Sequence, residues 1–168
     1  MLLIEDDEDD FLITRDLLAQ SGSIHFEVTW ATRLEEGMGL LESGETDVIL
    51  LDLSLPDSQG EETIKRMHEF RPAVPIIMLT GLEDESMALS AATLGAQDYL
   101  VKGQAQRDRL VRSIRYAIDR KRAEKELQAA HDRLEVRVEE RTADLARANE
   151  DLKKAVSELE KHDKAKSN

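Results

Sequence analysis

Short apolar runs alternate with longer amphipathic stretches along the first hundred residues. The runs are rich in β-branched and aromatic side chains, as β-strands are, and the stretches repeat apolar positions at helical spacing. The predicted strands are residues 2–4, 26–30, 48–51, 76–79 and 99–101, and the predicted helices are residues 11–20, 34–41, 60–70 and 86–94. This alternation predicts an α/β fold, with a parallel sheet that carries helices on both faces. The runs at 48–51 and 76–79 are apolar without alternation, so we expect them to be the central strands.

A different pattern begins after Gly103. Residues 104–166 contain neither glycine nor proline, and one helix of that length would extend ~95 Å at about 1.5 Å per residue. Apolar side chains recur there every seven residues, which predicts a coiled coil. The repeating residues are Val138, Leu145, Leu152 and Leu159, preceded by Leu127 and Leu134.

Two heptad registers fit this repeat. A continuous heptad puts the first two leucines at d and the later series at a, but it also places Arg141 and His162 at d. The other register puts the series from Val138 onward at d and Asn149 at a, with a four-residue slip before Val138. We favour the second, because a single Asn at a fixes the register of a parallel dimer. The sequence thus predicts a parallel homodimer through residues 121–165.

Charge and composition divide the chain at the same place. Residues 1–103 hold 22 acidic residues against 6 Lys or Arg, together with every glycine and proline, whereas the rest holds 14 against 17. The acidity of the first part argues against nucleic-acid binding, which needs a basic surface. We expect one globular domain at 1–120 and a helical segment at 121–168.

Several function classes are excluded by what the sequence lacks. Without cysteine there is no disulfide, thiolate nucleophile or Cys-based metal site. No apolar run approaches the about 18 residues of a membrane span. Met1 leads through three apolar residues into six consecutive acids, which no signal peptide resembles. We therefore expect a cytoplasmic protein that contacts no membrane.

Polar groups follow four of the predicted strands. Glu5 and Asp6 follow the first strand. Asp52 follows the third, Thr80 the fourth and Lys102 the fifth. Taken singly, each has a local structural explanation as a helix cap, a turn former or a solvated lysine. Because ligands of open α/β sheets bind beyond the carboxyl ends of the strands, we expect these side chains to share one crevice.

This combination of groups suits magnesium-assisted phosphoryl transfer. Crowded carboxylates repel one another without a cation, and their oxygens are ligands that Mg²⁺ accepts. One carboxylate can then attack a phosphoryl group while an amine and a hydroxyl contact its oxygens. Asp52 is the best candidate nucleophile, because it follows the most buried strand. Glu5 and Asp6 are placed to hold the metal beside it.

Four segments of the chain resemble the receiver domain of two-component response regulators. They occur in the right order over about 120 residues. The segments are Leu3–Asp7, Val48–Gly60, Leu79–Gly81 and Gly95–Lys102. The resemblance implies a flavodoxin-like (CheY-like) (βα)5 doubly wound parallel sheet with strand order 2-1-3-4-5.

The same resemblance implies roles for the acidic residues. It implies that Asp52 is the phosphoacceptor. It also implies that Glu5, Asp6 and the backbone carbonyl of Ser54 bind Mg²⁺ together with that aspartate.

Roles for the remaining residues follow from the resemblance as well. Thr80 would hydrogen-bond the phosphoryl group, Lys102 would pair with it, and Tyr99 would be an aromatic switch residue alongside Thr80. The residue after this lysine is usually proline in the family, often in a cis peptide, but here it is Gly103. Because a cis bond before a non-proline residue costs ~2.5 to 4 kcal/mol, we expect either a trans peptide or a local rearrangement of the backbone here.

Residues 139–145 resemble the signalling helices that join sensory or receiver modules to kinase or cyclase outputs, and residues 118–124 have a similar character. Residues 159–168 resemble the lead-in to a histidine-kinase dimerisation domain. The favoured hypothesis is a switch rather than a turnover enzyme. It would accept a phosphoryl group from a histidine kinase or phosphotransfer protein and signal through the coiled coil to an output domain, as part of a hybrid histidine kinase or a comparable regulator. His131 and His162 are each followed by an acid, as phosphoacceptor histidines often are, but we favour solvated or seam positions for both.

Two other hypotheses remain open. An aspartate-nucleophile phosphohydrolase of the haloacid-dehalogenase kind uses similar groups, but it has its nucleophile on the first strand and an acid two residues later, where this chain has Ser54 after Asp52. A structural dimeriser whose receiver no longer accepts phosphate is the other alternative, and the complete residue set disfavours it.

Overall fold

The computed structural model describes residues 1–20, 24–81, 93–103 and 107–166. The chain forms two compact units, Met1–Ala123 and Glu124–Asn168. The first unit contains the sheet, and the described residues of the second belong to the continuation of the last helix.

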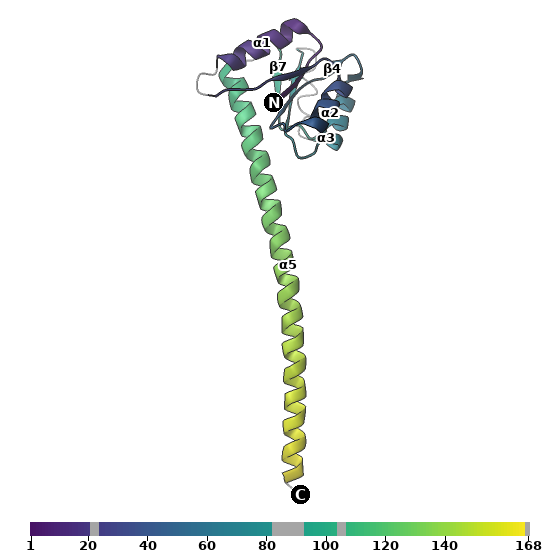
Figure 1. Cartoon of the computed structure of the whole chain (residues 1–168), viewed down its shortest axis with the longest axis vertical. Helices are drawn as coiled ribbons and strands as arrows, with labels where there is room; N and C mark the ends of the chain where they lie inside the picture. Colours follow the sequence, from purple (N-terminus) through teal and green to yellow (C-terminus); the bar gives the residue numbers. More distant parts are fainter. Residues whose placement is uncertain (21–23, 82–92, 104–106, 167–168) are drawn as a thin grey trace. The chain divides into compact units, whose positions relative to one another are not determined.

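A five-stranded parallel sheet forms the centre of the first unit (Figure 1). Its strands are β1 (Leu2–Ile4), β2 (Thr29–Ala31), β3 (Ile49–Asp52), β6 (Ile76–Thr80) and β7 (Asp98–Val101). Their order in the sheet is β2-β1-β3-β6-β7, which confirms the predicted flavodoxin-like order 2-1-3-4-5. Every residue of β3 and β6 is buried, as expected of central strands covered on both faces.

Alternate residues of β1, β3 and β6 supply two separate cores. Leu2, Ile4 and their counterparts pack with α2 (Leu34–Ser43) and α3 (Glu61–Phe70), which lie side by side in Figure 1. Leu3 and its counterparts pack on the opposite face with α1 (Glu8–Ala19) and the first turns of α5 (Arg107–Lys166). Since side chains alternate across a strand, each short apolar run serves both layers.

Several predicted element boundaries were wrong. The second strand begins at Thr29 and not at residue 26, because its partner β1 begins only at Leu2, which pairs with Thr29. The first helix begins at Glu8, because the Asp7 carboxylate accepts hydrogen bonds from two N–H groups of the first turn and caps the helix there. Most of the predicted helix at 86–94 lies outside the described residues. A short antiparallel hairpin of β4 (Ser54–Leu55) and β5 (Ser58–Gln59) was not predicted.

A residue in the turn of this hairpin, distant in sequence from α2, caps the N-terminus of that helix. Arg33 precedes α2 but makes no side-chain capping hydrogen bond. Instead, the Asp57 carboxylate accepts hydrogen bonds from the backbone N–H groups of Leu34 (2.9 Å) and Glu35 (3.0 Å). Partial burial acts to raise the pKa of Asp57, but these hydrogen bonds outweigh it and hold the pKa below its ordinary value.

Replacing Asp57 by alanine is expected to lower the free energy of unfolding by about 1 kcal/mol at pH 7, the usual loss for a helix cap. Because the folded-state pKa of Asp57 is depressed, its contribution is present above the unfolded pKa and disappears as the pH falls through the folded pKa. Urea unfolding at pH 7 and pH 3 measures both effects. An equal destabilisation at the two pH values would contradict the charged cap.

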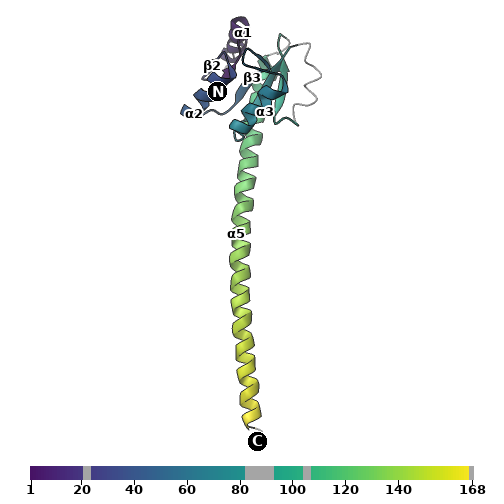
Figure 2. The same ribbon diagram turned by 90° about the vertical axis from the view of Figure 1, so that its right-hand side faces the viewer.

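The long helix predicted from the absence of breakers is present as α5, a continuous helix in both views (Figures 1 and 2). Its first turns bury Leu110, Ile114 and Ala117 in the sheet domain. From residue 124 onward the heptad residues are exposed in the single chain. These exposed residues are Leu127, Leu134, Val138, Leu145, Leu152 and Leu159. Among the described residues, no helix combines the length and the low charge that a bilayer-spanning segment requires.

Candidate functional site

Three of the predicted side chains meet at the carboxyl ends of the parallel strands. Asp52 ends β3, Glu5 follows β1, and both carboxylates are buried. Lys102 follows β7, and its ammonium nitrogen lies 2.8 Å from Asp52 Oδ2 and 2.7 Å from Glu5 Oε2. The parallel sheet therefore brings these residues together from three strands, as their positions in the sequence predicted.

Electrostatics in this cluster depend on burial and on the single lysine. Burial raises the pKa of Glu5 to about 7; the neighbouring Lys102 ammonium opposes this rise, and the Asp52 charge adds to it. Burial acts to lower the pKa of Lys102, but its interactions with Asp52 and Glu5 outweigh burial and raise that pKa above its ordinary value. The lysine is therefore charged at neutral pH.

The acidic residues fit a divalent cation. One carboxylate oxygen each from Glu5, Asp6 and Asp52 lies within 4.8 Å of the others. Asp6 is exposed, so the cluster opens to solvent on its side. Among the described residues, Glu5 Oε2 is a buried oxygen without a hydrogen-bond partner, although the ammonium is an ion-pair neighbour. Hard carboxylate oxygens are the ligands that Mg²⁺ prefers.

Ser54 lies two residues beyond Asp52, at the start of the hairpin. Its backbone N–H donates a 3.3 Å hydrogen bond to Asp52 Oδ1. The Ser54 side chain is exposed. This contact orients the Asp52 carboxylate at the sheet edge.

Thr80 and Tyr99 lie on the two strands beside the cluster. Thr80 ends β6 and is buried, and its hydroxyl donates to the carbonyl of Leu100 at 3.5 Å. In this structure the hydroxyl therefore contacts the neighbouring strand. Tyr99 is half-buried and packs against a small core that includes Ile64 and Met78.

The backbone after the lysine departs from the family pattern as expected. None of the described peptide bonds is cis, so the Lys102–Gly103 bond is trans as predicted. Gly103 has φ +72°, in the left-handed region that favours glycine. The backbone N–H of Lys102 donates to the Thr80 carbonyl at 2.8 Å, which ties the strand end to β6.

Two contacts at the site were not predicted from the sequence. Asp10 Oδ2 lies 3.1 Å from the Lys102 ammonium. The Trp30 indole N–H donates a 2.7 Å hydrogen bond to the Glu5 carbonyl, and the indole stacks on Phe11. The early start of α1 could have indicated Asp10, because it places that residue in the first helical turn beside the strand ends.

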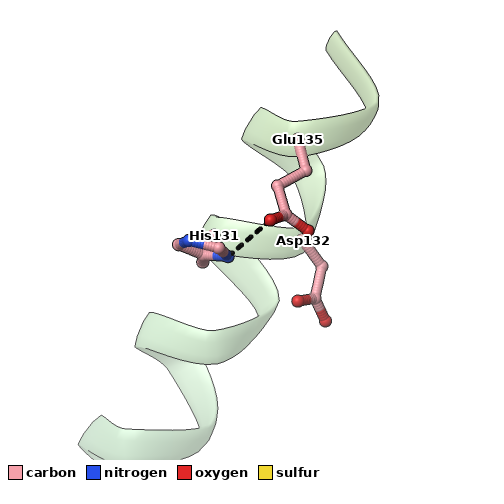
Figure 3. Close-up of side chains that lie close together, drawn as sticks. All are labelled: His131, Asp132 and Glu135. Carbon is pink, nitrogen blue, oxygen red and sulfur yellow. Dashed lines mark ion pairs between the residues drawn. The ribbon is translucent and has the colours of Figure 1, made fainter. Parts of the chain in front are cut away.

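His131 lies on α5 in an exposed group of three side chains (Figure 3). Its Nδ1 is 3.8 Å from Glu135 Oε1, one helical turn along, and Asp132 is adjacent in sequence. The side chain of His162 lies outside the described residues. His131 is thus a solvent-exposed histidine in the single chain.

Comparison with known proteins agrees with this geometry. The family model of the response regulator receiver domain matches residues 1–115. Response regulator SaeR of Staphylococcus epidermidis is 34% identical over 113 residues, which are 67% of this chain and 48% of that protein. The chain therefore spans about half the length of the curated relatives that it matches.

Solved structures give the same result. A receiver domain protein from Clostridium thermocellum is 27% identical with a TM-score of 0.64, and a CheY-like receiver domain protein from Methanospirillum hungatei is 28% identical with a TM-score of 0.60. Each comparison covers 73% of this chain and 95% of the other. The chain belongs to the response regulator receiver domain family.

Proposed function

We propose that residues 1–120 form a receiver switch that accepts a phosphoryl group on Asp52. The observation that carries the proposal is the contact of the Lys102 ammonium with both Asp52 and Glu5 at the carboxyl edge of the sheet. Receiver domains of response regulators are phosphoacceptors and not turnover enzymes. The donor would be phosphohistidine on a histidine kinase or phosphotransfer protein.

The transfer is a single displacement. A carboxylate oxygen of Asp52 attacks phosphorus, the new P–O bond forms as the donor P–N bond breaks, and the imidazole leaves with the electron pair. Glu5, Asp6, Asp52 and the Ser54 carbonyl would hold Mg²⁺, which would supply charge compensation when bound. Lys102 would pair with the phosphoryl oxygens.

Phosphorylation would then change the conformation of residues on two neighbouring strands, β6 and β7. The Thr80 hydroxyl donates to the Leu100 carbonyl at 3.5 Å, which is long for a hydrogen bond and therefore weak. The hydroxyl can exchange this acceptor for a phosphoryl oxygen. Tyr99, half-buried on the adjacent strand, would turn inward into space that this movement vacates. Such a rearrangement would bias the packing of the first turns of α5.

Residues 121–168 would be the signalling segment. We propose that residues 121–165 pair with a second copy as a parallel coiled coil, in the register with Asn149 at a. The exposed heptad leucines of α5 support this, since a solvated helix gains nothing from such a repeat. The coil would pass the signal to an output domain, as in a hybrid histidine kinase or a comparable regulator. We further propose that the protein acts in the cytoplasm, without nucleic acid or membrane as a direct partner.

Intact mass measurement after incubation with acetyl phosphate and Mg²⁺ tests the phosphoacceptor. The wild type is expected to gain one phosphoryl group, and Asp52→Asn none. Asp47→Asn, an exposed acid before the same strand, is the matched control and should label like the wild type. Absent labelling in the wild type would favour the dimerisation scaffold, and steady turnover of a phosphate ester that is lost in Asp52→Asn would favour the phosphohydrolase.

A further inference from the structure

We propose that Asp10 is a positioning residue that holds the Lys102 ammonium beside the site while a divalent cation occupies the carboxylates. This inference rests on the proposed function, because it concerns the same metal and lysine. It starts from a contact that the receiver resemblance does not imply: Lys102 Nζ lies 3.1 Å from Asp10 Oδ2.

The lysine has three carboxylate neighbours: its ammonium donates a hydrogen bond to Asp52 and forms ion pairs with Glu5 and Asp10. An ammonium group has three N–H bonds, and three carboxylates surround this one. Glu5 and Asp52 are the closer partners, at 2.7 and 2.8 Å, and both are buried. Asp10 is the more distant and more open partner, with 35% of its side chain exposed.

A cation at the acidic cluster has to compete with this ammonium. Glu5 and Asp52 supply oxygens to both the predicted metal position and Lys102. Two cations that share the same oxygens repel each other, so metal binding must weaken the contact of the lysine with Glu5. The Asp10 carboxylate lies outside the metal-binding group and stays available to the lysine.

The place of Asp10 is fixed independently of Lys102. Its backbone N–H donates a 3.1 Å hydrogen bond to the Asp7 carboxylate that caps α1. Asp10, Glu5 and Lys102 also line one cavity of about 150 Å³ between α1 and the end of β7. The lysine side chain therefore has room to move from Glu5 toward Asp10 while keeping a charged partner.

The effect of Asp10 on Mg²⁺ affinity follows from this movement of the ammonium between Glu5 and Asp10. Asp10 stabilises the ammonium after it leaves Glu5, and so reduces the free-energy cost of metal binding. Removing the Asp10 charge leaves the lysine with only those partners that the metal also needs. Asp10→Asn should therefore weaken Mg²⁺ binding and not strengthen it.

Trp30 offers a direct readout, because it is the only tryptophan and donates to the Glu5 carbonyl. MgCl₂ titration of the full chain, followed by tryptophan fluorescence, is expected to give a dissociation constant about fivefold higher for Asp10→Asn. Asp9→Asn is the matched control, since it removes the same charge from the exposed neighbour in the same helical turn. It should shift the constant less than about twofold, because exposed charges are screened.

A second pair of variants tests the route through Lys102. In a Lys102→Met background, adding Asp10→Asn should change the Mg²⁺ dissociation constant by less than about twofold, as expected when the partner is gone. An undiminished Asp10→Asn effect in that background, or an equal effect of Asp9→Asn, would overturn the proposal. A further measurement needs no metal. In the Mg²⁺-free protein, the ¹⁵N resonance of the Lys102 ammonium should shift in Asp10→Asn and not in Asp9→Asn.

The outcomes separate this inference from the proposed function. If Asp10→Asn binds Mg²⁺ like the wild type while the wild type still accepts phosphate from acetyl phosphate, only the role of Asp10 is wrong. If the wild type shows neither a Mg²⁺ response nor phosphorylation, both proposals are wrong.

Discussion

Lys102→Met is expected to lower the free energy of unfolding of the metal-free protein by about 3–5 kcal/mol at pH 8, the usual result of removing one partner of a buried ion pair. The lysine side chain is only 20% exposed and forms ion pairs with two buried carboxylates. Methionine keeps an unbranched apolar chain but leaves Glu5 and Asp52 as buried charges without a cation. Urea unfolding followed by Trp30 fluorescence measures the loss.

This loss should depend on pH through Glu5. The folded-state pKa of Glu5 is raised from 4.5 to about 7, so its contribution to stability is fully present below pH 4.5 and is lost as the pH rises through 7. Without the lysine the ionised form is still less favourable, and the loss becomes larger. The destabilisation by Lys102→Met should therefore be smaller at pH 5, where Glu5 is protonated in both proteins, than at pH 8.

Lys65→Met is the matched control. Lys65 pairs with Glu61 at 3.4 Å, but both side chains are about half exposed. Such surface pairs contribute about 0–1 kcal/mol, so this variant should unfold nearly like the wild type. Millimolar Mg²⁺ should restore part of the stability of Lys102→Met, because the cation compensates the same carboxylates. Equal losses at pH 5 and pH 8 would show that packing, and not charge, explains the effect.

The fold was predictable wherever one periodicity governed a whole segment. The runs at 48–51 and 76–79 lack alternation because helices cover both faces of β3 and β6, and both proved to be central strands. The second strand was predicted too early, since apolar residues such as Phe26 and Val28 pack against the core without strand pairing. A buried position favours an apolar residue whether or not its backbone joins a sheet.

The site was predictable to the level of strand ends, and no further. Parallel strands carry their last residues to one edge, so the positions of Asp52, Glu5 and Lys102 along the chain were enough to predict that these side chains meet. Partner choice within the edge depends on side-chain rotamers, which the sequence pattern does not encode. For that reason the contacts of Asp10 with the lysine and of Thr80 with the Leu100 carbonyl emerged only from the structure.

The proposed coiled coil leads to the second large effect. Replacing Leu145 and Leu152 together by glutamate is expected to convert a dimer into a monomer. Each leucine is exposed by about two thirds in the single chain, so its burial requires a second copy. Four buried leucines per dimer contribute about 6 kcal/mol at about 1.5 kcal/mol each, which is roughly ten-thousandfold in the dimer dissociation constant. Sedimentation equilibrium of the full chain measures the change.

A second pair of substitutions controls for added charge. Ala143→Glu with Ser157→Glu introduces the same two glutamates at exposed positions of the same helix. Both positions lie outside a and d in either heptad register, so this variant should remain dimeric. Monomer formation by both variants would show that added charge alone opens the dimer, and a wild type that is monomeric at high concentration would exclude the coil. If only the Leu145→Glu, Leu152→Glu variant dissociates, Leu145 and Leu152 must face the same residues of the second copy. Only in that arrangement do the new carboxylates meet like charges across the interface.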